Sequence, residues 1–451
     1  MIRSSLPRTS SALTITLVAL ACSLFAARAR AQDDAGPPPI PDSTATSPTA
    51  FQINKYDNLY QGQFTPGQGF DIIRTTRGTL NISMYGVFRY LNQLPADQKY
   101  LDHLGREKTV KTRQDLNWHR TMVWLTGWFA DPKFRYNITL WSLPTTQQTL
   151  LFGNLRYLMD ERMTFGVGIG PNLSNRSLQG SWPYWAGSDR QMGEEFIRGG
   201  FSSSFWVTGK LRRGMFYTTS VNTNISQLGV TASNDTRNMA FSGSVWWQPT
   251  TGEFGPRNGF GDLEHHDKLA TQFGLSSCMS RENRYASIPD APLNTQIRLS
   301  DGLLPFDVDA LANGVTVNAL TYQNLSFDAG AKYRGFSFQS EFTYRQLSDF
   351  SATGPVPDER IIDRMVFAEA MHMVVPQKLG LYAVTSYVFD QFGRNPWELG
   401  GGASFYPYGS RNWRINMHVL HVDKSPANSN FGYYMAGQTG TIISLGTDIL
   451  L

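Results

Sequence analysis

Cysteine and long apolar stretches are both scarce in this chain. The 451 residues include 2 cysteines, Cys22 and Cys278, and we expect Cys22 to leave with a cleaved leader. Cys278 alone can form neither an intramolecular disulfide nor a cysteine-rich metal site. After residue 31, no uninterrupted apolar run reaches about eighteen residues, so membrane-spanning helices are excluded by length. Any insertion into a membrane must therefore use β-strands.

Charge is scarce as well. Asp, Glu, Lys and Arg make up 17% of the residues, against about a quarter in ordinary soluble domains. The formal net charge is only +4, and the basic residues are spread along the chain instead of forming a block. We therefore expect no nucleic-acid partner. The 13% of aromatic residues and the 41 glycines are compatible with a membrane barrel.

The first 31 residues have the order of a secretory signal peptide. Arg3 and Arg8 precede an apolar segment over residues 12–27, and Ala29-Arg30-Ala31 resembles a cleavage site. We predict a signal peptide over residues 1–31 and a mature chain that begins near Gln32. A membrane anchor is an alternative, and Leu20-Ala21-Cys22 leaves a lipoprotein signal as another.

Residues 32–78 form a polar lead-in. Residues 36–39 read Gly-Pro-Pro-Pro, and a Ser/Thr-rich run follows up to Thr49. This composition cannot bury a core, so we predict a flexible periplasmic N-terminal segment. The later residues 62–70 are too few for a plug domain, which argues against a TonB-dependent transporter.

From Leu80 onward, apolar residues recur with a period of two. Leu80 and Ile82 share one face of an extended segment, and Asn81 and Ser83 share the other. Such alternation is expected of a strand with lipid on one side and water on the other. The same pattern recurs in residues 134–140, 336–345 and 441–451.

Short turn-forming clusters separate these segments at one end, and longer polar stretches connect them at the other. The clusters are residues 130–132, 159–162, 212–214, 334–335, 375–377 and 407–409. A chain that crosses a membrane back and forth alternates in this way, with short periplasmic turns and longer extracellular loops. We therefore predict an all-β protein, a transmembrane antiparallel up-and-down β-barrel of about sixteen strands over residues 79–451.

Two segments fit this pattern less well. Residues 118–129 have apolar side chains on both faces, and the connection over residues 248–267 is long for a periplasmic turn. Either segment could mark a miscounted hairpin. A soluble β-sandwich is the main alternative fold, but about 370 residues would be unusual for a single sandwich.

The last strand carries a second signal. Residues 441–451 alternate and end in Leu451. A terminal amphipathic strand that ends in an apolar residue is what the barrel assembly machinery recognises, so we expect that machinery as a partner. Most such strands end in Phe, and this one ends in Leu.

The pattern resembles bacterial outer-membrane porins, and more weakly the phosphate-selective porin group. Residues 327–341 are similar to a hairpin of that group in which the second strand carries an inward glutamate, Glu341, and residues 399–407 are similar to its penultimate hairpin. The similarity is architectural and covers most of the chain after Leu80. It implies an outer-membrane location, a water-filled channel for passive diffusion of small hydrophilic solutes, and a homotrimer surrounded by outer-membrane lipid.

In sixteen-stranded porins, the third outer loop commonly folds into the barrel and narrows it. The corresponding loop runs from about Pro171 to Gly200. Basic and acidic groups that face each other across a constriction set up a transverse field. A solvated surface loop is the alternative. The charged constriction-loop candidates are Arg176, Asp189, Arg190, Glu194, Glu195 and Arg198.

Two tryptophans, Trp182 and Trp185, lie in the same loop. We expect them to pack the loop against the barrel wall, with a stacking surface for sugars as the alternative.

Wall residues on the alternating strands are predicted to face the water-filled lumen. These pore-lining candidates are Arg89, Arg135, Lys210, Lys332, Glu341, Arg345 and Arg414. Few inward acids oppose the cations, chiefly Glu341, Asp328 and Asp448. We therefore expect a modest preference for anions, with phosphate as the anion that the family resemblance suggests.

Two other functions are weighed against the channel. A barrel hydrolase would need a serine beside a histidine; His372, His418 and His421 lie in predicted strands near Ser386 or Ser404, but no G-x-S-x-G motif marks a nucleophile. A structural or adhesive barrel would need a lumen blocked by side chains. We expect no enzyme, no catalytic residue and no cofactor.

One polar run could attract a divalent ion. Residues 261–267 contain Asp262, Glu264, His265 and His266. Adjacent histidines lack a recognisable ligand spacing, so the run is interpreted as a polar periplasmic turn and no metal site is predicted.

Overall fold

In the computed structural model of the protein, the described residues are 66–178, 182–226, 238–254, 260–429 and 432–451. The predicted signal peptide and residues 32–65 of the predicted N-terminal segment lie outside them. No helix within the described residues is long and apolar enough to cross a membrane.

Nearly all regular structure is β-strand, and one sheet contains 17 strands. Its strands are β1 (Phe70–Thr75), β2 (Gly78–Leu94), β5 (Gln114–Phe129), β6 (Asp131–Leu143), β7 (Gln148–Asp160), β8 (Met163–Pro171), β9 (Phe201–Arg212), β10 (Met215–Asn222), β11 (Ala240–Trp247), β12 (Ala270–Asn283), β13 (Val317–Tyr333), β14 (Phe336–Ala352), β15 (Arg360–Val375), β16 (Leu379–Phe389), β17 (Trp397–Phe405), β18 (Trp413–Asp423) and β19 (Gly440–Leu450). A separate hairpin pairs β3 (Asp97–Leu101) with β4 (Glu107–Lys111). The described residues also form three short helices, η2 (Pro144–Thr146), η3 (Arg176–Leu178) and α2 (Met192–Ile197).

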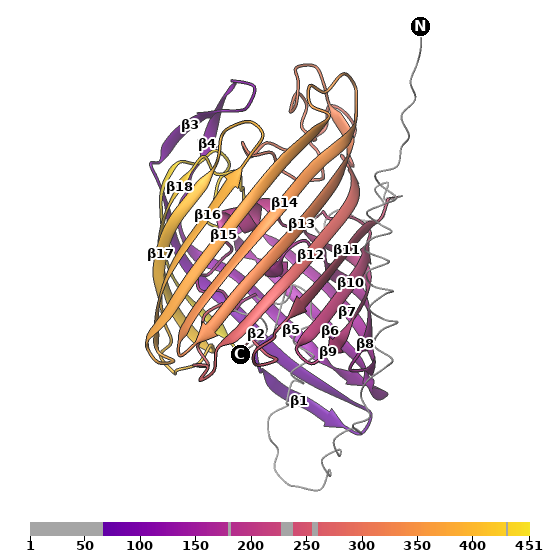
Figure 1. Ribbon diagram of the computed structural model, residues 1–451, viewed down its shortest axis with the longest axis vertical. Coiled ribbons are helices and arrows are strands. Elements are labelled where there is room, and N and C mark those ends of the chain that lie inside the picture. The colour runs from indigo at the N-terminus through magenta and orange to yellow at the C-terminus, as the bar shows by residue number, and fades with distance from the viewer. Residues whose placement is uncertain (1–65, 179–181, 227–237, 255–259, 430–431) are drawn as a thin grey trace. The chain divides into compact units, whose positions relative to one another are not determined.

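The sheet closes on itself (Figure 1). Each strand from β5 to β19 pairs antiparallel with its neighbour along the chain, and β19 returns to pair with β2 from Thr441↔Leu94 to Leu450↔Tyr85. The sixteen strands β2 and β5 to β19 therefore form an up-and-down barrel with no open edge, which confirms the predicted architecture and strand count. The seventeenth strand, β1, pairs with the start of β2 outside this ring.

The alternation predicted from the sequence is confirmed along the wall. On β14, Phe336, Phe338 and Phe342 are exposed on the outer face, whereas Gln339 and Thr343 are buried on the inner face. Large apolar side chains are likewise exposed on the outside of most other strands. A barrel with an apolar exterior and a polar interior is suited to a membrane, where lipid replaces water around the wall.

Tight turns join the strands at one end of the barrel, which we call the turn end. Between β13 and β14, Arg334 and Gly335 have φ angles of 47° and 81°, the conformation of a two-residue hairpin turn whose twist matches that of the strands. Longer connections lie at the opposite, loop end. The β11–β12 connection, residues 248–269, is a long connection at the turn end, as its sequence indicated. It is not a miscounted hairpin, so the predicted strand count is unaffected.

We predict that a charge placed at mid-depth on the outer face destabilises the barrel in lipid. Leu275 on β12 is 52% exposed and lies beside Phe327 of β13. Leu275→Arg is expected to lower the free energy of unfolding in lipid vesicles by about 2–4 kcal/mol. In the matched control, Leu101→Arg, the residue is similarly exposed at 58% but belongs to the β3–β4 hairpin. Equal effects of the two substitutions in a urea titration would contradict a lipid-facing position for Leu275.

Candidate functional site

The connection between β8 and β9 contains η3 and α2, and we call it L3. Its described residues, 172–178 and 182–200, lie inside the barrel. Nearly all of its described residues are buried. The backbone N–H of Arg176 donates to Glu341 of β14 at 2.9 Å, and Asp189 forms an ion pair with Arg120 of β5. L3 therefore contacts two walls of the barrel that are far apart in the strand order.

The short helix α2 is held by its first turn. Gln191 and Glu194 form a reciprocal capping box. The next free N–H groups are bound by the wall: Met192 donates to Glu398 Oε1 at 2.8 Å and Gly193 donates to Ser386 Oγ at 3.1 Å. The first N–H groups of a helix have no acceptor inside the helix. Here β16 and β17 supply the missing hydrogen-bond acceptors.

One side of L3 presents a carboxylate to a basic wall. Besides its pair with Arg120, Asp189 lies 3.6 Å from the guanidinium of Arg89 on β2. Arg89 also contacts His119 Nε2 at 2.9 Å. All of these side chains are buried, and buried charges are tolerated only where opposite charges and hydrogen bonds compensate them.

The other side of L3 presents a cation to an acidic wall. The guanidinium of Arg176 lies 4.0 Å from Asp328 on β13, and its backbone N–H is bound by Glu341. Strands β13 and β14 lie on the far side of the barrel from β2 and β5 in strand order. L3 thus matches each wall with the opposite charge.

Wall arginines also donate to L3 carbonyl oxygens. Arg414 of β18 donates to Trp185 O at 2.5 Å and to Ala186 O at 3.0 Å, while it pairs with Asp448 of β19 at 2.7 Å. Such an arginine forms an ion pair with a wall carboxylate and at the same time donates hydrogen bonds to the backbone of L3. Arg345 of β14 repeats the arrangement, with Asp363 at 2.6 Å and Phe196 O at 3.3 Å.

Aromatic packing completes the attachment of L3. Trp182 is 1% exposed, meets Tyr85 edge-on with ring centroids 4.6 Å apart, and lies 6.2 Å from the ring of Trp124 on β5. The apolar residues on both faces of β5, which looked anomalous in the sequence, are explained by this contact: one face meets lipid and the other meets L3. Trp182 and Trp185 both pack in the interior.

The remaining charged residues of L3 interact mainly within the loop. Arg198 and Glu195 form a two-bond ion pair at 2.7 and 2.9 Å. Arg190 donates to Ser177 Oγ at 3.1 Å and lies over the Trp185 ring at 4.6 Å. Burial raises the pKa of Glu194 to about 7, because a charged carboxylate is costly away from water.

The seven predicted pore-lining residues occupy inward positions of the wall. Five of them are at most 3% exposed: Arg89, Lys332, Glu341, Arg345 and Arg414. The other two, Arg135 and Lys210, are partly exposed near the turn end, where Lys210 pairs with Glu161 at 3.1 Å. A water-lining role for these residues stays a prediction, since the buried five contact protein groups in this structure.

The inner wall carries more acidic residues than the sequence predicted. Asp363, Glu369 and Glu398 are also inward and at most 4% exposed. The alternation of β15 and β17 places these three carboxylates on the inner face. The hairpin register held a usable signal, since Asp363 lies directly opposite Arg345 and Asp448 directly opposite Arg414.

The β11–β12 connection also reaches into the barrel, which the sequence did not predict. The guanidinium of Arg176 lies over both Phe254 and Phe260, at 5.2 and 5.4 Å from the ring centroids. The backbone N–H of Phe260 donates to Tyr184 O of L3 at 2.9 Å. Gly330 of β13 makes room, because a Cβ there would lie 2.7 Å from Phe254.

Both serines and one of the three histidines considered for a hydrolase have other partners. Ser386 donates to Glu398 Oε1 at 2.7 Å, and Ser404 donates to Ala186 O at 2.8 Å. His418 pairs through Nδ1 with the Tyr382 hydroxyl at 2.9 Å. These serines serve to hold α2 and the L3 backbone.

No protein-family model matches the chain. No curated protein matches it in sequence either. Among solved structures, in-vitro folded OmpT, an outer membrane protein of Vibrio cholerae, is similar with a TM-score of 0.52 at 12% identity, over 84% of this chain and 99% of that chain. OmpT expressed in the outer membrane of the same organism has a TM-score of 0.52 at 10% identity over the same shares of the two chains. An anion-selective porin from Comamonas acidovorans has a TM-score of 0.48 at 12% identity, over 82% and 99%.

At such identities the likeness concerns the fold. The chain has the fold of a bacterial outer-membrane β-barrel, as the sequence predicted.

We predict that Asp189→Asn loosens L3. Arg89 and Arg120 would lose the carboxylate that they share, and breaking a buried ion pair typically costs about 3–5 kcal/mol. The expected result is a lower free energy of unfolding in detergent micelles and faster proteolysis within L3. Asp71→Asn is the control, because Asp71 pairs with Arg74 at the exposed strand β1 and should cost about 1 kcal/mol or less. Similar losses for both variants would show that Asp189 does not hold the loop.

Proposed function

We propose that the chain is an outer-membrane porin that lets small hydrophilic solutes diffuse through its barrel. One observation carries this proposal: a closed sixteen-stranded barrel with an apolar exterior and a charged interior is crossed by a loop attached to both walls. Buried charge pairs stabilise a fold no better than an apolar core would, so stability alone does not explain the charged interior. It suits a lumen that passes polar solutes and is narrowed by L3.

The same proposal orients the barrel and assigns its partners. The turn end faces the periplasm and the loop end faces outward, as in barrels whose short turns are periplasmic. Residues 1–31 act as a signal peptide, and residues 32–78 precede the barrel as a periplasmic segment of which the last part includes β1. The barrel assembly machinery recognises β19, outer-membrane lipid surrounds the wall, and three copies form a homotrimer.

A preference for anions, phosphate among them, is supported by the basic side of the lumen. Arg89, Arg113 and Arg120 lie close together with two carboxylates, Asp115 and Asp189. The group carries one more positive charge than negative. An excess of buried positive charge beside the path lowers the electrostatic barrier for a negative solute.

A barrel that does not conduct is the second candidate. The burial of Arg89, Arg345 and Arg414, each at most 1% exposed, favours it, because water does not reach these wall positions while L3 is docked. The two candidates differ in whether L3 leaves a continuous aqueous path.

The test is planar-bilayer conductance of the folded mature protein in potassium chloride. We expect stepwise increases in conductance, and under a salt gradient a reversal potential that reports anion preference. A folded barrel that never conducts would overturn the channel and favour the second candidate. Steps without anion preference would retain the porin and remove its selectivity.

We predict that inward cations contribute to selectivity. The double variant Lys332→Gln, Arg345→Gln is expected to shift the reversal potential toward cations, because two positive charges leave the lumen. Arg364→Gln is the matched control, since Arg364 is on β15 next to Asp363 but is exposed on the outer face. An unchanged reversal potential in the double variant, or an equal shift in the control, would remove Lys332 and Arg345 from the conduction path.

A further inference from the structure

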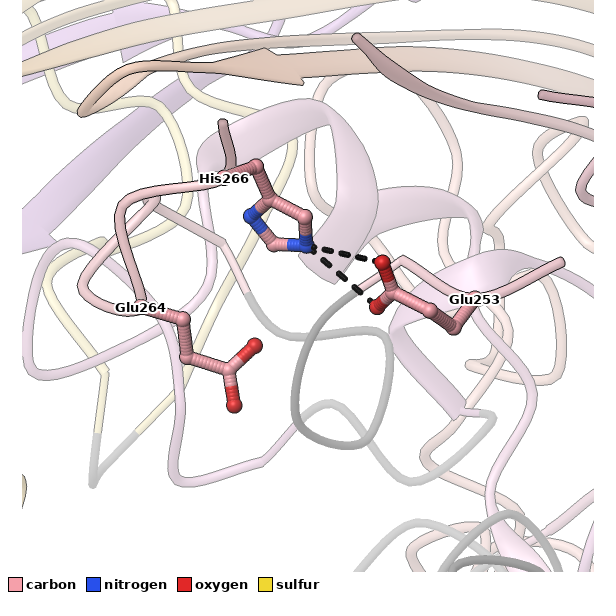
Figure 2. Close-up of side chains that lie close together, drawn as sticks. All are labelled: Glu253, Glu264 and His266. Atoms are coloured by element: carbon pink, nitrogen blue, oxygen red, sulfur yellow. Dashed lines mark hydrogen bonds and ion pairs between the residues drawn. The ribbon is translucent and has the colours of Figure 1, made fainter. Parts of the chain in front are cut away.

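The β11–β12 connection brings together three side chains that can bind a metal ion (Figure 2). Glu253 follows β11, whereas Glu264 and His266 precede β12. One ligand atom from each residue lies within 4.8 Å of the others. His266 Nε2 is 3.2 and 3.3 Å from the two carboxylate oxygens of Glu253. The group cannot be recognised from the ligand spacing within residues 261–267, because Glu253 lies outside that run.

The imidazole ring of His266 is oriented by a fourth residue that is not among the three. Its Nδ1 pairs with the carboxylate of Asp262, so Nε2 points toward Glu253. Asp262 is itself fixed, because its side chain is fully buried and accepts the backbone N–H of Gly335 at 2.8 Å. Metal-binding histidines commonly have the second ring nitrogen bound to a carboxylate in this way, which fixes the tautomer and the ring direction.

The charges around the group leave room for a cation. Glu253, Glu264 and Asp262 supply three carboxylates. The amine of Lys332 on β13 attracts the carboxylate of Glu264 electrostatically. A metal ion would take the position of the proton on Nε2 and release that proton to solvent. Glu264 is exposed, so an ion can reach the group from solvent without crossing the barrel.

We propose that Glu253, Glu264 and His266 bind a divalent transition-metal ion such as Zn²⁺, with Asp262 as the positioning residue for His266. One imidazole nitrogen and two carboxylates are ligands that Zn²⁺ accepts, with water completing the coordination. The ion joins the part of the connection that follows β11 to the part that precedes β12. Phe254, directly after Glu253, then stays against Arg176 of L3. The site does not depend on whether the barrel conducts.

The experiment titrates Zn²⁺ into the folded, untagged mature barrel in detergent, in competition with a chromogenic zinc indicator. We expect one ion per chain in the wild type. Glu264→Gln and His266→Gln are expected to weaken binding at least about tenfold, the scale on which losses at metal sites are found. Glu264→Gln guards against misfolding, because this side chain is exposed and its loss leaves the Asp262–His266 pair in place.

The matched control is His265→Asn, which removes the neighbouring histidine. Asn is chosen because residue 265 has a φ of 58°, a conformation that Asn tolerates better than most residues. Binding should be unchanged in this variant. No saturable binding to the wild type, equal affinity in the wild type and both Gln variants, or an equal loss with His265→Asn would overturn the site. Conductance is not measured, so this result and that of the bilayer test are independent.

Discussion

Ion pairs of opposite polarity attach L3 to the two walls of the barrel. Asp189 meets the guanidinium groups of β2 and β5, and Arg176 meets the carboxylates of β13 and β14. Because these side chains are buried, each of their charges would be costly without its partner. The charged groups of each wall therefore need L3 as their partner, and the charged groups of L3 need both walls. Arg345 and Arg414 strengthen the attachment by donating to L3 carbonyl oxygens.

This arrangement changes the electrostatic picture that the sequence favoured. Free charges of opposite sign across a constriction would set up a transverse field through water. In the structure, the charges of L3 and of the wall approach to ion-pair distance, so much of the field ends within the pairs. The net charge that remains at each wall comes from a few groups, such as the excess of arginines around Asp189. In the proposed channel, selectivity would depend on small differences between large, nearly cancelled charges.

The strands of the wall could be predicted from the sequence because one face of each strand meets lipid and the other meets the polar lumen. Lipid and lumen require alternate residues of β14 to be apolar and polar, and a hairpin such as Arg334-Gly335 fixes where the next strand begins. Contacts inside the lumen follow no such period. Nothing in the local sequence of Asp189 indicates Arg120 as its partner, because the pair depends on the path of L3 across the barrel. The position of Glu253 beside His266 is likewise a product of the folded connection.

The same reasoning explains why an inward arginine need not line water. Arg414 has Asp448 directly across the strand pair, and this cross-strand partner leaves donors free to bind the backbone of L3. If L3 moved away, Arg414 would keep its carboxylate, but its donors to Trp185 and Ala186 would turn to water. Arg89 and Arg120 would instead lose the carboxylate of Asp189 altogether. Displacing L3 would therefore increase the positive charge on the β2–β5 wall far more than on the β18–β19 wall. In the proposed channel, the position of L3 would set both the width of the path and its charge.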